Sequence, residues 1–261
     1  MIFPNSAAPS GRLAADGRGC ARQCMKAIEF LADPTSGELR IGCNEPVANG
    51  LLPAVIDRLS RRYPHIIFDV ILGTPDTLQS RELRERMCDL VVARLVPSVE
   101  PDMEAEVLFN EELVIVAGAQ SKWAKRRKID LDELVDEPWI LTTQENKDNS
   151  PVAQAFRERG LDPPRARVLG YSQNIRNNLL LTGRFLTVVP ASVLRFGVSR
   201  LLLKALPVEL PGQRYPVVII TVKGRTLSPV AQLFIEGARE IAKSMSDKHG
   251  NLKAVEWNFD P

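Results

Sequence analysis

Small polar side chains follow the apolar, strand-like segments of this chain at several places. They are Asn44, Thr74, Thr142, Thr143, Gln144, Ser172 and Asn174. Hydroxyl and amide groups at the carboxyl ends of strands are typical of sites that hold a small molecule by hydrogen bonds. Helices begin beside such strand ends, and their free backbone N–H groups favour an anion. The pattern therefore predicts a binding site for a small polar molecule.

Two of these residues also have a simpler explanation as helix caps. Thr74 precedes Pro75, and threonine before proline is a common helix start. Ser172 precedes a helical pattern that runs to about Thr182. A cap and a ligand contact are compatible, because the capping residue lies beside the exposed helix end. The loop after Leu141 has a similar alternative as a solvated surface loop.

Known catalytic motifs are missing from the sequence. It contains no GxSxG, Walker loop, GxGxxG or HExxH. The two histidines, His65 and His249, offer no base to a serine, threonine or cysteine nucleophile. The four cysteines suit neither a zinc site nor a disulfide framework: Cys20, Cys24, Cys43 and Cys88. We expect a protein that is not an enzyme and that uses no cofactor and no metal.

Length and charge further limit the kinds of protein that this chain could be. The 261 residues suffice for one large domain or two small ones, and 44% hydrophobic with 25% charged residues is globular. A net charge of +2 does not favour nucleic-acid binding by bulk charge. The basic run at residues 122–128 fits a solvated loop. No apolar segment approaches a membrane span, and the start lacks a secretory pattern, so we expect a cytoplasmic protein without membrane partners.

The predicted elements alternate between strand and helix. Residues 38–93 read as βαβαβ, which indicates a parallel sheet with right-handed crossovers. Strand candidates at residues 104–109 and 112–117 are expected to pair, and they open a second α/β unit. A late strand at residues 215–222 and a helix capped by Ser228 complete the pattern.

The order of these elements and their wording resemble the effector-binding region of LysR-type transcriptional regulators. Seven segments carry the resemblance: GELRIGC at 37–43, GLLPAVIDRLSRRYP at 50–64, GT at 73–74, DLVVAR at 89–94, LFNEELVIVAGAQSKWA at 108–124, LDELVDEPWIL at 131–141 and LTGRFLTVVPASVL at 181–194. The similarity extends from residue 38 to about residue 246.

The resemblance implies an α/β fold similar to type II periplasmic binding proteins. Two Rossmann-like subdomains would be joined by two crossover strands, with a small-molecule effector in the cleft between them. Subdomain I would comprise residues 38–97 plus 198–246, and subdomain II residues 98–197. Residues 1–37 would be a leader or the remnant of a linker helix, and residues 247–261 a C-terminal tail.

The resemblance also assigns pocket positions. Pro46 stands where the family often has a hydroxyl that binds an effector carboxylate. Proline cannot donate, and Glu45 would repel an anion, so we expect an effector with few carboxylates. Phe185 replaces the glycine usual in the family and would narrow the cleft or contact an effector ring, while Pro190 closes the pocket-lining turn. Arg94 ends a strand at the first crossover and would pair with an effector anion or with a hinge carboxylate.

The function implied is an effector sensor of a LysR-type regulator. A winged helix-turn-helix does not fit within residues 1–37, so DNA would be contacted only through a DNA-binding domain missing from this chain. A homodimer or higher oligomer is implied, including one formed with an intact regulator. Leu51, Val55 and the strand near Leu108 are the expected contacts. The alternative on the same fold is a solute-binding protein of a transport system.

Overall fold

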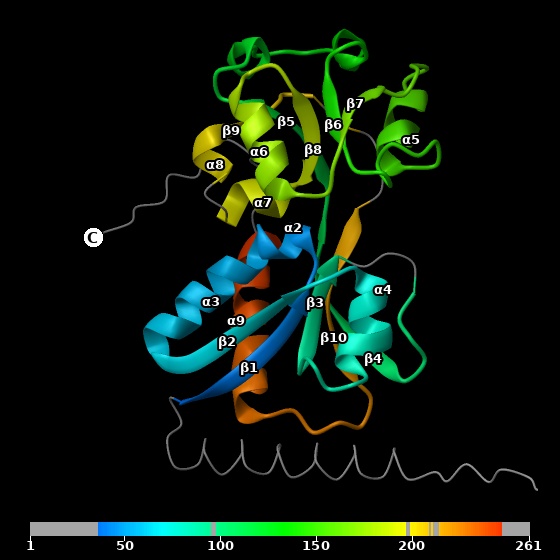
Figure 1. The fold of residues 1–261 in the computed structure, drawn as a ribbon. Helices are drawn as coiled ribbons and strands as arrows, with labels where there is room; N and C mark the ends of the chain where they lie inside the picture. The colour runs from blue at the N-terminus through cyan, green and yellow to red at the C-terminus, as the bar shows by residue number, and fades with distance from the viewer. Residues whose placement is uncertain (1–35, 95–97, 197–198, 209, 211–213, 247–261) are drawn as a thin grey trace, which may run out of the picture.

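The structure is a computed structural model that describes residues 36–94, 98–196, 199–208, 210 and 214–246. These residues form two lobes, and each lobe is built on one five-stranded mixed sheet covered by helices (Figure 1). The predicted α/β fold with two subdomains is confirmed. The expected tail and nearly all of the expected leader lie outside the described residues.

The first lobe contains the predicted βαβαβ unit. Its sheet runs in the order β2 (His65–Leu72), β1 (Ser36–Cys43), β3 (Leu90–Arg94), β10 (Tyr215–Val222) and β4 (Met103–Glu111). Strands β1, β2 and β3 are parallel, and β10 is antiparallel to both β3 and β4. Helices α3 (Leu51–Arg62) and α9 (Pro229–Ser246) pack together on one face of this sheet (Figure 1).

The amphipathic pattern of α3 determines its packing. Leu51, Leu52, Val55 and Leu59 share one helical face and are buried together with residues of β1 and α9. Leu51 and Val55 are therefore core residues, and their assignment to an oligomer contact is wrong. The reason is that α9, nearly 170 residues further along the chain, belongs to the same core as the apolar face of α3. The local pattern does not indicate which element covers that face.

The helix after Thr74 differs from the prediction. Only α4 (Pro75–Thr77) is α-helical, and it continues as the π-helix η1 (Leu78–Leu83) rather than as an α-helix to Arg86. Arg86 adopts a left-handed conformation, with φ of 61°, so the helix ends before it.

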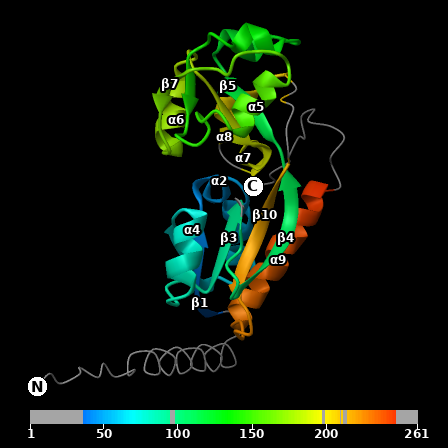
Figure 2. The same cartoon turned by 90° about the vertical axis from the view of Figure 1, so that its right-hand side faces the viewer.

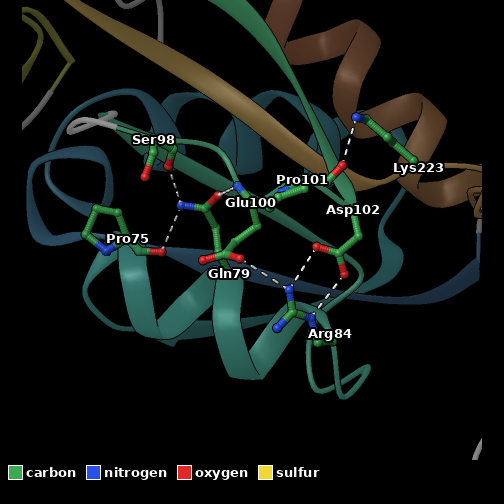
Figure 3. Close-up of polar contacts among 8 residues, drawn as sticks. All are labelled: Pro75, Gln79, Arg84, Ser98, Glu100, Pro101, Asp102 and Lys223. Carbon is green, nitrogen blue, oxygen red and sulfur yellow. Dashed lines mark hydrogen bonds and ion pairs between the residues drawn. The ribbon is translucent and has the colours of Figure 1, made fainter.

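The buried Gln79 of η1 fixes the loop that leads to β4 (Figure 3). Its amide donates to the carbonyls of Pro75 and Ser98, both at 3.4 Å, and its oxygen accepts from the Glu100 N–H at 3.2 Å. Arg84 adds a bidentate pair to Asp102, at 2.8 and 3.1 Å. These hydrogen bonds hold the loop against the π-helix.

The second lobe has its own sheet and core. The strand order is β7 (Ala166–Leu169), β6 (Trp139–Leu141), β8 (Leu186–Pro190), β5 (Leu113–Gly118) and β9 (Leu203–Ala205). Around it lie η2 (Lys122–Lys125), η3 (Leu131–Leu134), α5 (Pro151–Arg157), α6 (Gln173–Leu181), α7 (Ala191–Phe196) and α8 (Ser199–Leu202). Trp139 and Phe156 meet edge to face in the core, with ring centroids 5.8 Å apart.

The chain passes between the lobes twice, after β4 and between β9 and β10. The expected pairing of residues 104–109 with 112–117 is wrong, because β4 lies in the first sheet and β5 in the second. The chain runs on through Glu111 and Glu112 without a hairpin turn. Two strands thus lie beyond the expected subdomain boundaries: β4 belongs to the first sheet, and β9 to the second.

Candidate functional site

The lobes meet where the carboxyl ends of several strands come together. In both views, α7 of the second lobe lies beside α2 (Glu45–Ala48), the short helix that follows β1 (Figures 1 and 2). On the first lobe, Asn44 follows β1 and Arg94 ends β3. The Arg94 N–H donates to Asn44 Oδ1 at 3.4 Å, so these two predicted site residues are adjacent.

Arg94 is the last residue of β3 and lies where the first lobe meets the second. Its guanidinium stacks over the ring of Tyr215, 4.4 Å from the ring centroid. Burial lowers the pKa of Arg94, and the charges of Glu111 and Glu145 oppose this effect. Since Glu145 belongs to the second lobe, the lobes are close enough there for their charges to interact. Glu111 is a hinge carboxylate whose charge acts on Arg94, and the pairing of Arg94 with an effector anion stays a prediction.

Glu111 is the last residue of β4, and only 5% of its surface is exposed. Its carboxylate is hydrogen-bonded by the side chain and the backbone of Ser192, in α7. Burial raises the pKa of Glu111, and the hydrogen bonds from Ser192 and the charge of Arg94 offset part of that rise. This carboxylate links both lobes, and no local sequence pattern indicates it.

On the second lobe, Thr142 and Glu145 form a reciprocal pair at the end of β6. The Thr142 N–H donates to Glu145 Oε2 at 2.8 Å, and the Glu145 N–H donates to Thr142 Oγ1 at 3.1 Å. Arg176 of α6 pairs with the same carboxylate at 3.3 Å. Arg176 also donates to the Val188 carbonyl at 2.7 Å and to the Thr187 hydroxyl.

Sequence reasoning missed Glu145 and Arg176 as site residues, although both left a signal. Threonine followed three residues later by glutamate is a capping-box pattern. Arg176 shares the buried face of α6 with Gln173 and Leu180, at helical spacing. A charged residue on a buried helical face needs a partner, so its position indicates a polar cluster.

Within the described part of the chain, the remaining predicted site residues make no hydrogen bond to the charged residues at the lobe junction, and their place in a common site stays a prediction. Thr74 is exposed, and its hydroxyl is engaged in a reciprocal cap with Thr77. Pro46 is half-buried in the first turn of α2. Ser172 caps α6 by accepting from the Ile175 N–H at 3.5 Å. Three others are exposed at the start of α6 and in the turn after Thr142: Asn174, Thr143 and Gln144.

Phe185 is separated from the other predicted site residues. Strand β8 runs parallel to β6, with Leu186 opposite Trp139, so Phe185 lies at the edge where β6 begins. Pro190 lies at the other end of β8, about 16 Å away at 3.3 Å per residue. Phe185 packs into an apolar cluster with Leu180 and neighbouring side chains. One small ligand does not reach both ends of this strand.

The described cysteines are structural. Cys43 and Cys88 are free and buried, in apolar clusters on opposite faces of the first sheet. Burial raises the pKa of both thiols to about 12. Thiolate is the reactive form, so neither side chain is activated.

We expect both thiols to react slowly with Ellman's reagent in the folded Cys20→Ser/Cys24→Ser variant. A pKa of about 12 instead of 9.0 leaves roughly a thousandfold less thiolate at pH 8. Unfolding in urea should restore reaction of two thiols per chain. A folded-state rate equal to that of free cysteine would contradict the burial described here.

Other kinds of site receive no support from the described part of the chain. Its His, Cys, Asp and Glu side chains form no group of three or more that could hold a metal ion. No helix within the described ranges combines the length and apolar character needed to cross a bilayer. In the basic run, Lys122 pairs with Glu137 and Arg126 with Glu133, as expected for a solvated surface.

Two α/β lobes with strand ends meeting at two crossovers define a ligand-binding module similar to type II periplasmic binding proteins. Residues 32–243 match the family model of the LysR substrate binding domain. The chain therefore belongs to the LysR substrate-binding-domain family and is an effector-sensing domain of a LysR-type transcriptional regulator. The alternative of a transport solute-binding protein receives no support, because the matched family and its relatives are regulators.

Three known proteins illustrate the similarity. The transcriptional dual regulator GltC of Bacillus subtilis is 27% identical over 229 residues, which cover 82% of this chain and 73% of GltC. The effector binding domain of QuiR in complex with shikimate aligns with a TM-score of 0.58 at 19% identity, covering 80% of this chain and 98% of that chain. The CcmR regulatory domain of Synechocystis in complex with 2-PG gives 0.61 at 19% identity, covering 80% and 99%. At these identities the two structures show the shared fold.

Proposed function

We propose that a small organic effector binds between the two lobes and shifts the balance between open and closed forms. The observation that carries this proposal is the close approach of the two lobes beside the strand ends, where a Cβ atom added at Gly50 of the first lobe would lie 2.9 Å from Ser192 Oγ of the second. A molecule that touches both lobes favours the closed form, because it binds that form better. The ligands of QuiR and CcmR, shikimate and 2-PG, support a small polar effector.

The proposed contacts lie on both sides of the lobe junction. On the first lobe they are Asn44, Pro46, Thr74 and Arg94. On the second lobe they are Thr142, Thr143, Gln144, Ser172, Asn174 and Pro190, with Glu145 and Arg176 behind them. Phe185 is left out, because it lies before the start of β8, whereas Pro190 lies at the other end of this strand. Each arginine of the junction already faces a carboxylate, which favours an effector with few carboxylates.

A thermal-shift screen of metabolites should find an effector that raises the melting temperature. At a hundredfold excess over its Kd, such a ligand adds about 2.7 kcal/mol to the free energy of unfolding. Asn44→Ala and Thr142→Val should each weaken the best hit several-fold in calorimetric titration, since a neutral hydrogen bond contributes about 1 kcal/mol. Thr182→Ala, at the far end of α6, is the matched control. Unchanged affinity in both test variants would sink the assignment.

The proposed role also implies how the protein contacts DNA and where it is located. DNA would be contacted through a DNA-binding domain that is separate from the residues described here, and the sensing domain itself would bind without catalysing a reaction. A transcriptional regulator works where the DNA lies, so we propose a cytoplasmic location. The family membership supports each of these points.

We also propose that the domain forms a homodimer or a higher oligomer, including one with an intact regulator. The expected contacts at Leu51 and Val55 are replaced by exposed apolar residues on two edge strands and the adjoining helix. On β2 these are Ile67 and Leu72; in the second lobe they are Leu169 on β7, Ile175 on α6 and Tyr171 in the link between these two elements. An antiparallel pair of chains would cover the β2 surface of one with the β7 surface of the other.

Sedimentation velocity at micromolar concentration should show a dimer that Ile67→Lys converts to monomer. A charge placed on an apolar interface must be desolvated without a partner, which costs far more than the contact contributes. Met87→Lys is the control, because Met87 is exposed to 46% compared with 66% for Ile67 and lies in the turn before β3, outside both proposed surfaces and outside the strand near Leu108. A wild-type chain that stays monomeric would overturn the proposal.

A further inference from the structure

Four side chains from four elements meet where the lobes join. Arg94 ends β3, Glu111 ends β4, Tyr215 begins β10, and Ser192 lies in the first turn of α7. Glu111 and Tyr215 face each other across the antiparallel ladder of β4 and β10. Both crossovers, the first lobe and the second lobe therefore each contribute one residue. We call these four residues the hinge cluster.

The hinge cluster joins the lobes directly through hydrogen bonds from the side chain and the backbone of Ser192. Ser192, which is buried in the second lobe, hydrogen-bonds the carboxylate of Glu111, in the first sheet. The first lobe also packs against Ser192 directly. A Cβ atom added at Gly50, between α2 and α3, would lie 2.9 Å from Ser192 Oγ. Any rotation of the lobes about the crossovers changes both contacts.

The same cluster leaves two polar atoms without partners. Glu111 Oε2 and Arg94 Nε are buried and make no hydrogen bond within the described part of the chain. Arg94 is held between the Tyr215 ring and the charges of Glu111 and Glu145. A buried charged group that is only partly satisfied is costly, so the closed arrangement depends on the bonds that remain.

We propose that the hinge cluster is a latch between the lobes, in which the bond from Ser192 to Glu111 sets the ratio of open to closed molecules before any effector binds. The latch would regulate effector binding between the lobes, so its regulatory role rests on the proposed function. Its physical action does not depend on the effector. Breaking the bond should raise the open population and thereby weaken any ligand that selects the closed form.

The test measures the distance between the lobes in the absence of effector. Spin labels are attached at Ser60→Cys on α3 and Gln154→Cys on α5, both exposed, in the Cys20→Ser/Cys24→Ser background. The two buried cysteines stay unlabelled. Pulsed electron spin resonance then gives the distance distribution for the full chain with and without Ser192→Ala.

Ser192→Ala should increase the ratio of open to closed molecules about tenfold or more. The reason is that a hydrogen bond to a charged group contributes more free energy than a tenfold change in an equilibrium constant requires. Glu111→Gln keeps an acceptor for Ser192 but loses the charge, so it should shift the distribution in the same direction by less. Ser228→Ala is the control: Ser228 is an equally buried serine that caps α9 within the first lobe.

A distribution for Ser192→Ala that matches the wild type would overturn the latch, as would an equal shift in Ser228→Ala. If the latch holds but the metabolite screen finds no ligand, the proposed effector fails and the latch stands. If a ligand binds between the lobes and Ser192→Ala changes neither distances nor affinity, the latch fails and the proposed function stands.

Discussion

Gly118→Ala is expected to lower the free energy of unfolding by about 3 kcal/mol or more. Gly118 ends β5, and a Cβ atom there would lie 2.0 Å from the carbonyl oxygen of Leu180 and 2.9 Å from its carbonyl carbon. These are backbone atoms of α6, so no side-chain rotation relieves the clash. Overpacking of this kind costs roughly 1–3 kcal/mol and more where the backbone must move.

The same substitution should also disturb the site, because α6 carries Arg176 and its cap Ser172. Urea unfolding measures the stability, with Gly170→Ala as the matched control. An added Cβ at Gly170 meets nothing within 4 Å, and its φ is not positive, so the change should stay within about 0.5 kcal/mol. Equal midpoints for the two variants would show that β5 and α6 are not packed as described.

Arg176→Met should destabilise the protein by about 3 kcal/mol. The side chain is 5% exposed and donates to Glu145, to Thr187 and to the Val188 carbonyl. Methionine fills much of the volume but leaves a carboxylate and a buried carbonyl without their donor. Removing one partner of a buried ion pair typically costs about 3–5 kcal/mol. We take the lower figure, since 20% of the Glu145 side chain is exposed.

A matched surface pair separates this effect from the loss of any salt bridge. Arg126→Met breaks the exposed pair with Glu133 and should cost at most about 1 kcal/mol. Adding Glu145→Gln to Arg176→Met should recover part of the loss, because the carboxylate left without a partner is then neutral. The interpretation fails if Arg176→Met unfolds at the same urea concentration as Arg126→Met.

Local patterns in the sequence predicted much of the fold. Alternating apolar residues located β1, the helical stripe located α3, and capping residues placed the helix starts at Thr74, Ser172 and Ser228. These signals depend on residues within about one helical turn of each other. The ordered segments together also indicated the family, which the match to residues 32–243 confirms.

Long-range pairing was beyond the sequence. The sequence predicted that β4 and β5 pair, whereas β4 joins the first sheet and β5 the second, since strand patterns indicate which face is buried but not which strand is the neighbour. The face of α3 with Leu51 and Val55 is covered by α9, so an apparent contact surface became core. The resemblance placed Phe185 in the pocket, whereas Phe185 precedes β8 and Pro190 lies at the other end of that strand.

The class of fold, the family and a set of polar residues at strand ends could be predicted from the sequence, because each depends on local order. Which of these residues lie together, and which charged residues contact them, depends on the folded chain. Arg176 and Glu145 are 31 residues apart, and Ser192 and Glu111 come from different lobes. Such pairs form because burial leaves a charged group no water to bind, and the folded chain must supply the partner.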